Sequence, residues 1–591
     1  MSDPKTAVEG ARDAATASVS EASDPYARAG QTFPVLTDEQ VARVAAYGEE
    51  ARFEDGAVLF ARGDRGADFF LVLEGAVEIT DRDPDGDLVV ITTHERHQFT
   101  GELDLFNNRA VLVGGRTRGA SRLVRLNREQ FRRMSSTEQD LGELMMRAFI
   151  LRRTGFLVHD EAGVVVIGEA NDRETIRIRR FLSRNGYPSR AMEPGEEAAR
   201  AYAAECDLRL DGLPVVRTPD GQVYHAPATA DLADALGLTD ELDPNHTYDL
   251  AVVGAGPAGL SAAVYAASEA LDTVVIESEA PGGQAGTSSK IENYLGFPTG
   301  ISGQALAGRA WIQAQKFGAT FTIARPASTI TKAPGGFRLG TDDGHAVTAR
   351  AVVLACGATY RKLDLDDYER FEGQGIHYAA TALEAQLCRD QEVVVVGGGN
   401  SAGQAAVFLS RVASHVHVLI RSNGLAASMS DYLVRRIEQS GRITLHTNTE
   451  VTGLEGDHVL RRVTWTNNET NEAETREVGN LFVMIGAVPN TAWMGDCVAL
   501  DERGFVLTGQ RGGMGAGPGA GASRNDVAAT DATDATGAGD APREVTPFET
   551  DRPGIFAVGD VRAGSVKRVA SGVGEGSVCI SYVHAYLSEA D

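Results

Sequence analysis

The pattern of apolar and polar positions divides the chain into segments of different character. Residues 1 to about 35 carry Ala, Ser, Asp and Glu without apolar periodicity, and we expect a disordered tail there. Over residues 36–150, short β-rich runs are separated by Gly-Asp and Asp-Gly turns, and a helical run follows from Arg128 to Leu151. The β-rich runs are VLF (58–60), FFLVLEGAVEIT (69–80) and LVVITTH (88–94). The pattern predicts a mainly β domain.

A small α/β domain is predicted over residues 155–240. VVVIG (164–168) is typical of a buried strand, and residues 173–186 have helical spacing that ends at Gly186, a residue suited to close a helix. The remaining elements are strand, turn and strand over LPVVRTPDGQVY (213–224) and a closing helix over ATADLADALGL (228–238).

From residue 247 onward, strands, Gly-rich turns and helices alternate, which indicates doubly wound parallel sheets. Residues 509–545 interrupt this pattern with Gly, Ala, Asp and Thr and few large apolar side chains, so we expect a disordered surface insertion there. The pattern resumes at PGIFAVGD (553–560). The whole chain is therefore predicted to be a multidomain α/β protein.

Charge and composition exclude some partners. The formal net charge of −26 repels phosphate backbones and anionic lipid, so neither nucleic acid nor a membrane is expected as a partner. No apolar stretch is long enough for a membrane span, and the N-terminal residues lack the apolar core of a signal peptide. We therefore expect a cytoplasmic protein.

The five cysteines give no metal-ligand spacing and no Cys-x-x-Cys, so neither a metal site nor a redox pair is expected. We interpret them as free thiols in a reducing compartment. They are Cys206, Cys356, Cys388, Cys497 and Cys579.

A first dinucleotide-binding motif lies in residues 248–277. A predicted strand leads into Gly254-x-Gly256-x-x-Gly259, a helix follows, and the next strand ends in Glu277. In such a motif the glycines allow a tight turn and close approach of a pyrophosphate, the helix N-terminus faces the phosphates, and the acid accepts hydrogen bonds from a ribose. The alternative is an unrelated tight turn.

A second motif, in residues 391–422, repeats this order with Gly397, Gly399 and Ala402. Arg421, not an acid, follows its second strand. An arginine can pair with the 2′-phosphate of NADPH, so NADPH is favoured while NADH stays open. The alternative for Arg421 is a solvated loop residue. Two such sites suggest one bound flavin, FAD, and one exchangeable nicotinamide.

Residues 247–591 resemble the bacterial-type thioredoxin reductases. The resemblance rests on PGGQAGTSSKIENYLGFP (281–298), LACGATYRKL (354–363), GIFAVGDVRAG (554–564) and the insertion of the second motif inside the first domain. It implies an FAD-binding domain over 247–365 and 487–591 and an NAD(P)-binding domain over 366–486. It also implies that Gly283, Gln284 and Asn293 lie along the flavin and that Asp560 binds its ribitol chain.

The sequence departs from this family at the positions of its redox-active cysteines. Ala379 and Ala382 occupy the two positions of the family's redox-active cysteines, so no internal disulfide can accept electrons and no catalytic residue is assigned. Cys388 stands beyond the second position and is interpreted as a buried structural thiol.

Basic residues also depart from the family pattern. Only Arg421 remains of the family's basic cluster for the 2′-phosphate, which puts strict NADPH specificity in doubt. Lys567 and Arg568 stand where the family tends to have Arg-Gln. Two cations there would stabilise an anionic reduced flavin, and the alternative is a solvated loop pair.

The first predicted domain, over residues 36–150, resembles the cyclic-nucleotide-binding β-roll. Gly101-Glu102-Leu103 matches the start of that family's phosphate-binding cassette. Val111 stands at the expected arginine position, and Arg109 comes two residues early. Cyclic-nucleotide binding stays open, but a structural or protein-binding module is favoured because a positioned guanidinium is missing.

Residues 155–240 resemble a thioredoxin or glutaredoxin domain. Pro214 takes the place of the family's cis-proline, and the turn GEANDRETIR, where a redox pair would lie, has no cysteine. Docking of a redox partner is the use that this domain would retain.

These features predict an FAD-dependent NAD(P)H oxidoreductase of the thioredoxin reductase type, expected as a homodimer. The electron acceptor stays open between a partner's disulfide, a quinone, an iron–sulfur protein and oxygen, because no residue identifies it. The alternative is a flavin-based redox sensor with little turnover.

Overall fold

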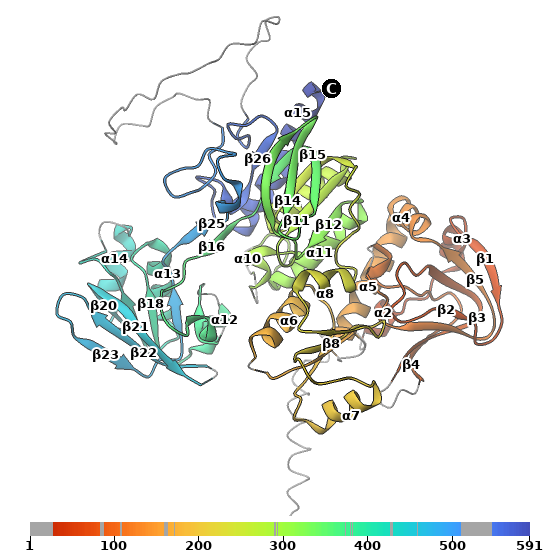
Figure 1. Cartoon of the computed structure of the whole chain (residues 1–591), viewed down its shortest axis with the longest axis horizontal. Coiled ribbons are helices and arrows are strands. Elements are labelled where there is room, and N and C mark those ends of the chain that lie inside the picture. Colours follow the sequence, from red (N-terminus) through yellow and green to blue (C-terminus); the bar gives the residue numbers. More distant parts are fainter. Residues whose placement is uncertain are drawn as a thin grey trace, which may run out of the picture.

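The computed structural model describes residues 28–590 except 83–87, 107–108, 159–162, 171, 289–290, 292–293, 373, 379, 381, 426–428, 458 and 510–545. Most of the predicted tail and insertion, and the site positions Asn293 and Ala379, therefore lie outside the described residues. Gly509, predicted as the first residue of the insertion, donates a backbone hydrogen bond to Glu549 and belongs to the fold. Figure 1 shows four modules, with the second dinucleotide-binding module set apart from the rest.

The N-terminal module is a β-roll closed by helices. Its strands pair in the order β1-β5-β3-β4, with β2 beside β5. The strands are β1 (Glu49–Phe53), β2 (Val58–Phe60), β3 (Phe69–Arg82), β4 (Leu88–His94) and β5 (Gly114–Leu126). The helices are α2 (Ala29–Thr32), α3 (Asp38–Ala45), η2 (Leu103–Phe106), α4 (Arg128–Thr137) and α5 (Gln139–Val158). Five buried phenylalanine rings contact one another in its core, namely Phe69, Phe99, Phe106, Phe131 and Phe149.

Two predictions for this module are wrong. The disordered tail was expected to reach residue 35, but residues 28–35 are ordered, because the Arg152 guanidinium donates to the carbonyl of buried Thr32. The single helical run from Arg128 is two helices. Glu138 leaves helical geometry between them, where its carboxylate is paired with Arg43 of α3.

The second module is a four-stranded sheet in the order β7-β6-β8-β9, flanked by helices as predicted. The Leu213–Pro214 peptide bond is cis, as the resemblance implies. Gly186, two residues beyond the last residue of α6, takes a positive φ of 59°, and the sequence placed the end of the helix there. The elements are β6 (Val164–Ile167), α6 (Arg173–Arg184), β7 (Ser189–Met192), α7 (Glu197–Glu205), β8 (Val215–Arg217), β9 (Val223–His225) and α8 (Thr229–Ala235).

The third module contains a sheet in the order β12-β11-β10-β15-β14-β13, with β26 beside β15. Its strands are β10 (Thr247–Val253), β11 (Thr273–Glu277), β12 (Thr320–Ile323), β13 (Ala327–Ala333), β14 (Gly336–Thr341), β15 (Ala346–Leu354) and β26 (Ile555–Ala557). The helices are α9 (Pro257–Ser268), α10 (Gly283–Gly286), α11 (Gly303–Lys316), η4 (Ala492–Met494), η5 (Gly559–Val561) and α15 (Val569–Ala590). Strands β12, β11, β10, β15 and β26 run parallel, which confirms the doubly wound pattern.

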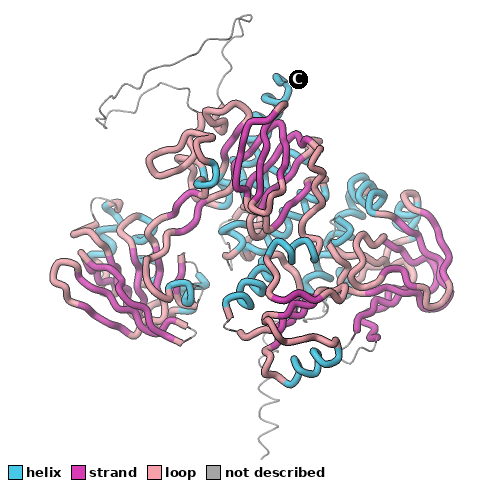
Figure 2. Tube along the Cα trace, in the orientation of Figure 1, coloured by secondary structure: helices cyan, strands magenta, loops and turns pink. Residues whose placement is uncertain are grey.

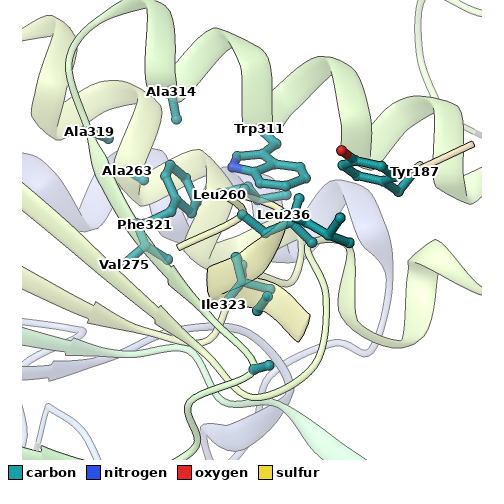
Figure 3. Packing of buried hydrophobic residues seen from close by; sticks show 14 of the residues in the cluster. Tyr187, Leu236, Leu260, Ala263, Val275, Trp311, Ala314, Ala319, Phe321 and Ile323 are labelled. Atoms are coloured by element: carbon teal, nitrogen blue, oxygen red, sulfur yellow. The ribbon is translucent and has the colours of Figure 1, made fainter. Parts of the chain in front are cut away.

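One hydrophobic core runs from the β-roll through the second module into the third. In Figure 3, Tyr187 and Leu236 of the second module lie beside Trp311 of α11, next to Phe321 and Val275 of the sheet. Burial of this continuous apolar surface fixes the first three modules against one another.

The fourth module is inserted between β15 and β26 of the third. It has a parallel sheet in the order β17-β24-β18-β19-β20 and an antiparallel sheet β21-β22-β23. The elements are η3 (Tyr368–Phe371), β17 (Ile376–His377), α12 (Ala382–Leu387), β18 (Glu392–Val396), α13 (Asn400–Leu409), β19 (His415–Leu419), α14 (Asp431–Glu438), β20 (Ile443–His446), β21 (Thr449–Gly456), β22 (Leu460–Asn467), β23 (Ala473–Arg476) and β24 (Leu481–Val483). A two-stranded ribbon of β16 (Ala358–Tyr360) and β25 (Ala487–Pro489) joins it to the third module, and Figure 2 shows this ribbon as the strand connection between them.

Candidate functional site: two glycine turns and a shared cleft

The first glycine turn lies between β10 and α9. A Cβ atom added to Gly254, whose φ is 102°, would lie 2.4 Å from the Ala355 carbonyl oxygen, and one added to Gly259 would lie 1.8 Å from the Gly254 oxygen. Both positions therefore exclude a side chain. Gly256 is the N-cap residue directly before α9 and offers no side-chain cap, and a Cβ there would meet no atom within 4 Å. The turn is thus packed on its sheet side, and its helix N-terminus is open to a phosphate.

Glu277 ends β11 and is buried beneath this turn. Its Oε2 accepts a hydrogen bond of 2.7 Å from the Ala255 N–H, and its Oε1 accepts one of 2.9 Å from the Glu279 N–H. Burial raises the pKa of Glu277, and these backbone donors oppose the shift. The carboxylate therefore holds the shape of the glycine turn, while its predicted contact with a ribose stays a prediction.

The Gly-Gly-Gln segment meets the same turn. The Gly282 N–H donates to the Ala255 oxygen over 2.7 Å, and a Cβ on Gly283 would lie 3.1 Å from Gly256 Cα. Arg184, from the second module, donates to the Gly283 oxygen over 3.2 Å and pairs with Glu279. The sequence did not predict this contact, because it joins separate modules.

The closing motif is organised by Glu575 of α15, a residue that the sequence did not single out. Its Oε2 accepts from the Gly559 N–H over 2.7 Å, and its Oε1 accepts from Arg562 over 2.8 Å. Burial alone would raise the pKa of Glu575, but the hydrogen bonds from Arg562, Gly559 and Ser565 outweigh it and lower that pKa. A charged Glu575 therefore fixes the turn that carries Asp560.

Asp560 and Lys567 lie together on this turn. Lys567 Nζ donates to the Asp560 carbonyl oxygen over 3.0 Å and lies 4.4 Å from the centre of the Phe505 ring. Burial lowers the pKa of Lys567 and raises that of Asp560. Among the residues that the structure describes, Lys567 lines the cleft defined below, whereas its neighbour Arg568 does not.

The second glycine turn, between β18 and α13, repeats the first. A Cβ on Gly397 would lie 2.4 Å from the Met484 oxygen and 3.2 Å from the Ala402 Cβ. Gly399 is the N-cap residue directly before α13 and offers no side-chain cap, and a Cβ there would meet no atom within 4 Å. This turn therefore has the same open helix N-terminus.

One cleft of about 1580 Å³ lies between the third and fourth modules. It is lined by Gly397, Gly399 and Arg421 from the second site and by Gln284, Asp560 and Lys567 from the first. The Arg421 side chain is 82% exposed. Residues of both predicted sites thus open onto the same space, which is large enough for an extended cofactor.

Two tyrosine rings line this cleft beside the ribbon. Tyr360 of β16 and Tyr378 stack with ring centres 5.3 Å apart and planes inclined by 5°. The Tyr378 hydroxyl donates to Glu372. The aromatic stack connects the ribbon to the segment in which the family carries its two cysteines.

All five cysteines are free thiols, so no disulfide stands in for the missing pair. Ala382 begins α12, and its partner position Ala379 lies outside the described residues. Cys388 ends this segment, fully buried, with its Sγ donating to the Glu384 oxygen over 2.8 Å. Burial raises the pKa of Cys388 to about 11, which keeps the thiol neutral, as expected for a structural residue.

Two charged residues of the described part of the β-roll cassette contact other parts of the protein. Glu102 is paired with Arg153 of α5 over 2.5 Å. Arg109 is buried with its guanidinium 4.3 Å from the Trp311 ring centre. The remaining cavity of about 60 Å³, lined partly by Val111, is far smaller than an ordinary small-molecule pocket.

Two absences concern metals and membranes. Across the described residues, no group of three or more His, Cys, Asp or Glu side chains is arranged to hold a metal ion. In the same part of the chain, no helix has both the length and the apolar character that a membrane span needs.

Comparison with known proteins identifies the relatives of this chain. Residues 248–513 match the family "Pyridine nucleotide-disulphide oxidoreductase", and residues 50–138 match "Cyclic nucleotide-binding domain". Thioredoxin reductase of Treponema pallidum is 32% identical over 340 residues, covering 58% of this chain and 97% of that protein. Thioredoxin reductase of Mycolicibacterium smegmatis is 36% identical over 259 residues, 44% of this chain and 82% of that protein. The crystal structure of thioredoxin reductase from Streptococcus pyogenes is 28% identical, covers 58% of this chain and 99% of that chain, and aligns with a TM-score of 0.44.

Members of the thioredoxin reductase family bind FAD and NADPH. The two open helix N-termini and the shared cleft fit two dinucleotides, because each site offers backbone N–H groups to a pyrophosphate. The residues from 247 onward carry two glycine turns and match nearly the full length of a thioredoxin reductase, so they are those of an oxidoreductase. The chain belongs to the thioredoxin reductase family of pyridine nucleotide-disulphide oxidoreductases.

Proposed function

We propose that this oxidoreductase moves electrons from NAD(P)H through FAD directly to an external acceptor, without an internal dithiol. When bound, FAD accepts a hydride from NAD(P)H and passes two electrons on. The single observation that carries the proposal is the cleft onto which residues of both dinucleotide sites open, in a chain with Ala379 and Ala382 at the cysteine positions.

The chain's own residues would hold the two cofactors. We assign Gly254, Gly256, Gly259 and the α9 N-terminus to the FAD pyrophosphate, Glu277 to its ribose and Asp560 to its ribitol. Gly283, Gln284 and Asn293 would lie along the flavin. Gly397, Gly399 and Ala402 at the start of α13 would hold the nicotinamide coenzyme, with Arg421 near its adenosine end. The positive charge of Lys567 in the cleft would stabilise an anionic reduced flavin, with Arg568 adding charge from outside it.

Direct transfer from the flavin follows from the state of the thiols. Burial raises the pKa of Cys388 to about 11 and that of Cys356 to about 12, so both are neutral thiols and poor nucleophiles. With Ala379 and Ala382 at the family's cysteine positions, the acceptor would have to reach the flavin itself. A redox protein is one candidate, since the relatives are thioredoxin reductases, and a quinone or oxygen are others.

A matched pair of substitutions tests this assignment. Gly256→Asp and Gly399→Asp each place a carboxylate at the first residue before a helix, where Asp is favourable for folding and the structure has room for it. The same carboxylate repels a pyrophosphate. We expect G256D to be purified without yellow colour, whereas G399D retains flavin but is no longer reduced by NADPH.

The reverse result, with flavin bound to G256D, would overturn the assignment. Turnover is measured separately, by following NADPH oxidation with a disulfide protein, a quinone, an iron–sulfur protein or oxygen. Continued oxidation with one of them supports the enzyme. A single reduction per flavin followed by arrest with all of them would indicate a redox sensor instead.

A further inference from the structure

Glu450 lies beside Arg421 in the cleft, at the end assigned above to the adenosine of the coenzyme. The Glu450 Oε1 is 3.8 Å from the Arg421 Nε, and both residues line the cleft. Glu450 comes from β21, whereas Arg421 follows β19. A carboxylate and a guanidinium therefore face the same part of the coenzyme site.

The backbone fixes this position. The Thr449 N–H donates to the Ile420 oxygen over 2.9 Å, and the Asn448 N–H donates to the Ser422 oxygen over 3.0 Å. These two bonds attach the start of β21 to the residues that follow β19. The backbone at Glu450 is consequently fixed near Arg421, although the Glu450 and Arg421 side chains are 43% and 82% exposed.

The chemistry of the two coenzymes gives this acid a role. In dinucleotide sites an acid at the end of the second strand accepts hydrogen bonds from the ribose hydroxyls of NADH, and an arginine there accommodates the 2′-phosphate of NADPH. Here Arg421 occupies that end, and the acid comes from the neighbouring strand. A carboxylate within ion-pair distance of Arg421 both weakens the attraction of that arginine for a phosphate and repels the phosphate directly.

We propose that Glu450 sets the coenzyme preference of this chain by accepting a hydrogen bond from the 2′-hydroxyl of NADH and repelling the 2′-phosphate of NADPH. The inference rests on the proposed hydride transfer at the same cleft. It assigns to this chain a use of NADH that Arg421 alone would not predict.

The test uses the full-length flavoprotein and a matched control. Glu450→Gln removes the charge and keeps the shape of the side chain. Glu455→Gln makes the same change on the same strand, at a residue that pairs with Arg462 and does not line the cleft. The measurements are the rates of flavin reduction by NADPH and by NADH, and calorimetric binding of 2′,5′-ADP and of 5′-ADP.

We expect E450Q to raise the ratio of NADPH to NADH reduction rates by about tenfold, the order expected for one nearby charge in a water-exposed site. The ratio of 2′,5′-ADP to 5′-ADP affinity should rise with it, and E455Q should leave both ratios unchanged. A change of less than threefold in E450Q, or an equal change in E455Q, overturns the inference. If neither coenzyme reduces the wild-type flavin, the proposed function fails, and the two ADP affinities still decide the role of Glu450.

Discussion

The guanidinium of Arg109 lies 4.3 Å from the centre of the Trp311 ring and donates to the Asn185 oxygen over 3.5 Å. Arg109 belongs to the cassette of the β-roll, Asn185 to the second module and Trp311 to helix α11 of the third. The arginine nearest to the expected phosphate-binding position therefore joins three modules to one another. The cassette in this structure serves as a junction between modules.

We therefore expect the full-length protein not to bind cyclic AMP or cyclic GMP. Arg109 is directed to Trp311, Glu102 is held by Arg153, and the remaining cavity is about 60 Å³. Isothermal titration with each nucleotide should give no measurable heat of binding. Binding with a dissociation constant of about 100 μM or tighter, near −5.5 kcal/mol, would contradict this interpretation of the cassette.

Replacing Gly576 with Ala should destabilise the third module. A Cβ there would lie 2.2 Å from the Ala258 oxygen, so α15 would have to move away from α9, at a cost of about 1–3 kcal/mol. The displaced α9 should also retain less flavin. Gly574 lies in the same helix with no atom within 4 Å of its Cβ position, and Gly574→Ala should stabilise the helix by about 0.5–1 kcal/mol. Thermal unfolding of both variants measures the difference, and equal melting temperatures would exclude this packing argument.

Glu575→Gln should weaken flavin retention by about tenfold at neutral pH, because one acceptor of charge-assisted hydrogen bonds is lost. The pKa of Glu575 in the folded chain is below its ordinary value of 4.5. Its stabilising effect is therefore complete above about pH 4.5 and is lost as the pH falls through the lower folded-state pKa. Wild-type protein should release flavin in that acidic range.

Glu502→Gln, at an exposed position in the same module, is the control and should behave as wild type. Flavin fluorescence in the filtrate after ultrafiltration, followed against pH, measures release. If E575Q and the wild-type protein release flavin over the same acidic pH range, another group controls flavin retention.

Alkylation of the native protein with iodoacetamide should leave NADPH oxidation unchanged. Cys388 and Cys579 are fully buried, and burial raises the pKa of both thiols. Mass spectrometry would count the modified cysteines while NADPH oxidation is measured in parallel. Loss of turnover in proportion to modification would mean that a thiol takes part in electron transfer after all.

The two dinucleotide-binding units could be predicted because each is a local pattern. A buried strand, a glycine turn and a helix lie within one short stretch, and the sheet order follows from it. The break at Glu138 could not be predicted, since it depends on Arg43 of another helix. Glu575 and Glu450 were missed for the same reason, because each contacts a residue that lies outside its own element.

Other predictions stay untested. Asn293 and Ala379 lie outside the described residues, and the cofactor contacts of the remaining site residues stay predictions. The homodimer expected from the sequence also stays a prediction, which light scattering of the purified protein can check.

The ribbon of β16 and β25 has a consequence for how this protein is assembled. Ala358 pairs with Pro489 and Tyr360 with Ala487, so the chain enters and leaves the fourth module at neighbouring points. Excising everything between these strands would leave two ends that a short turn can rejoin at little entropic cost. The fourth module can thus be removed as a unit, and the polypeptide that remains should still fold and bind a flavin.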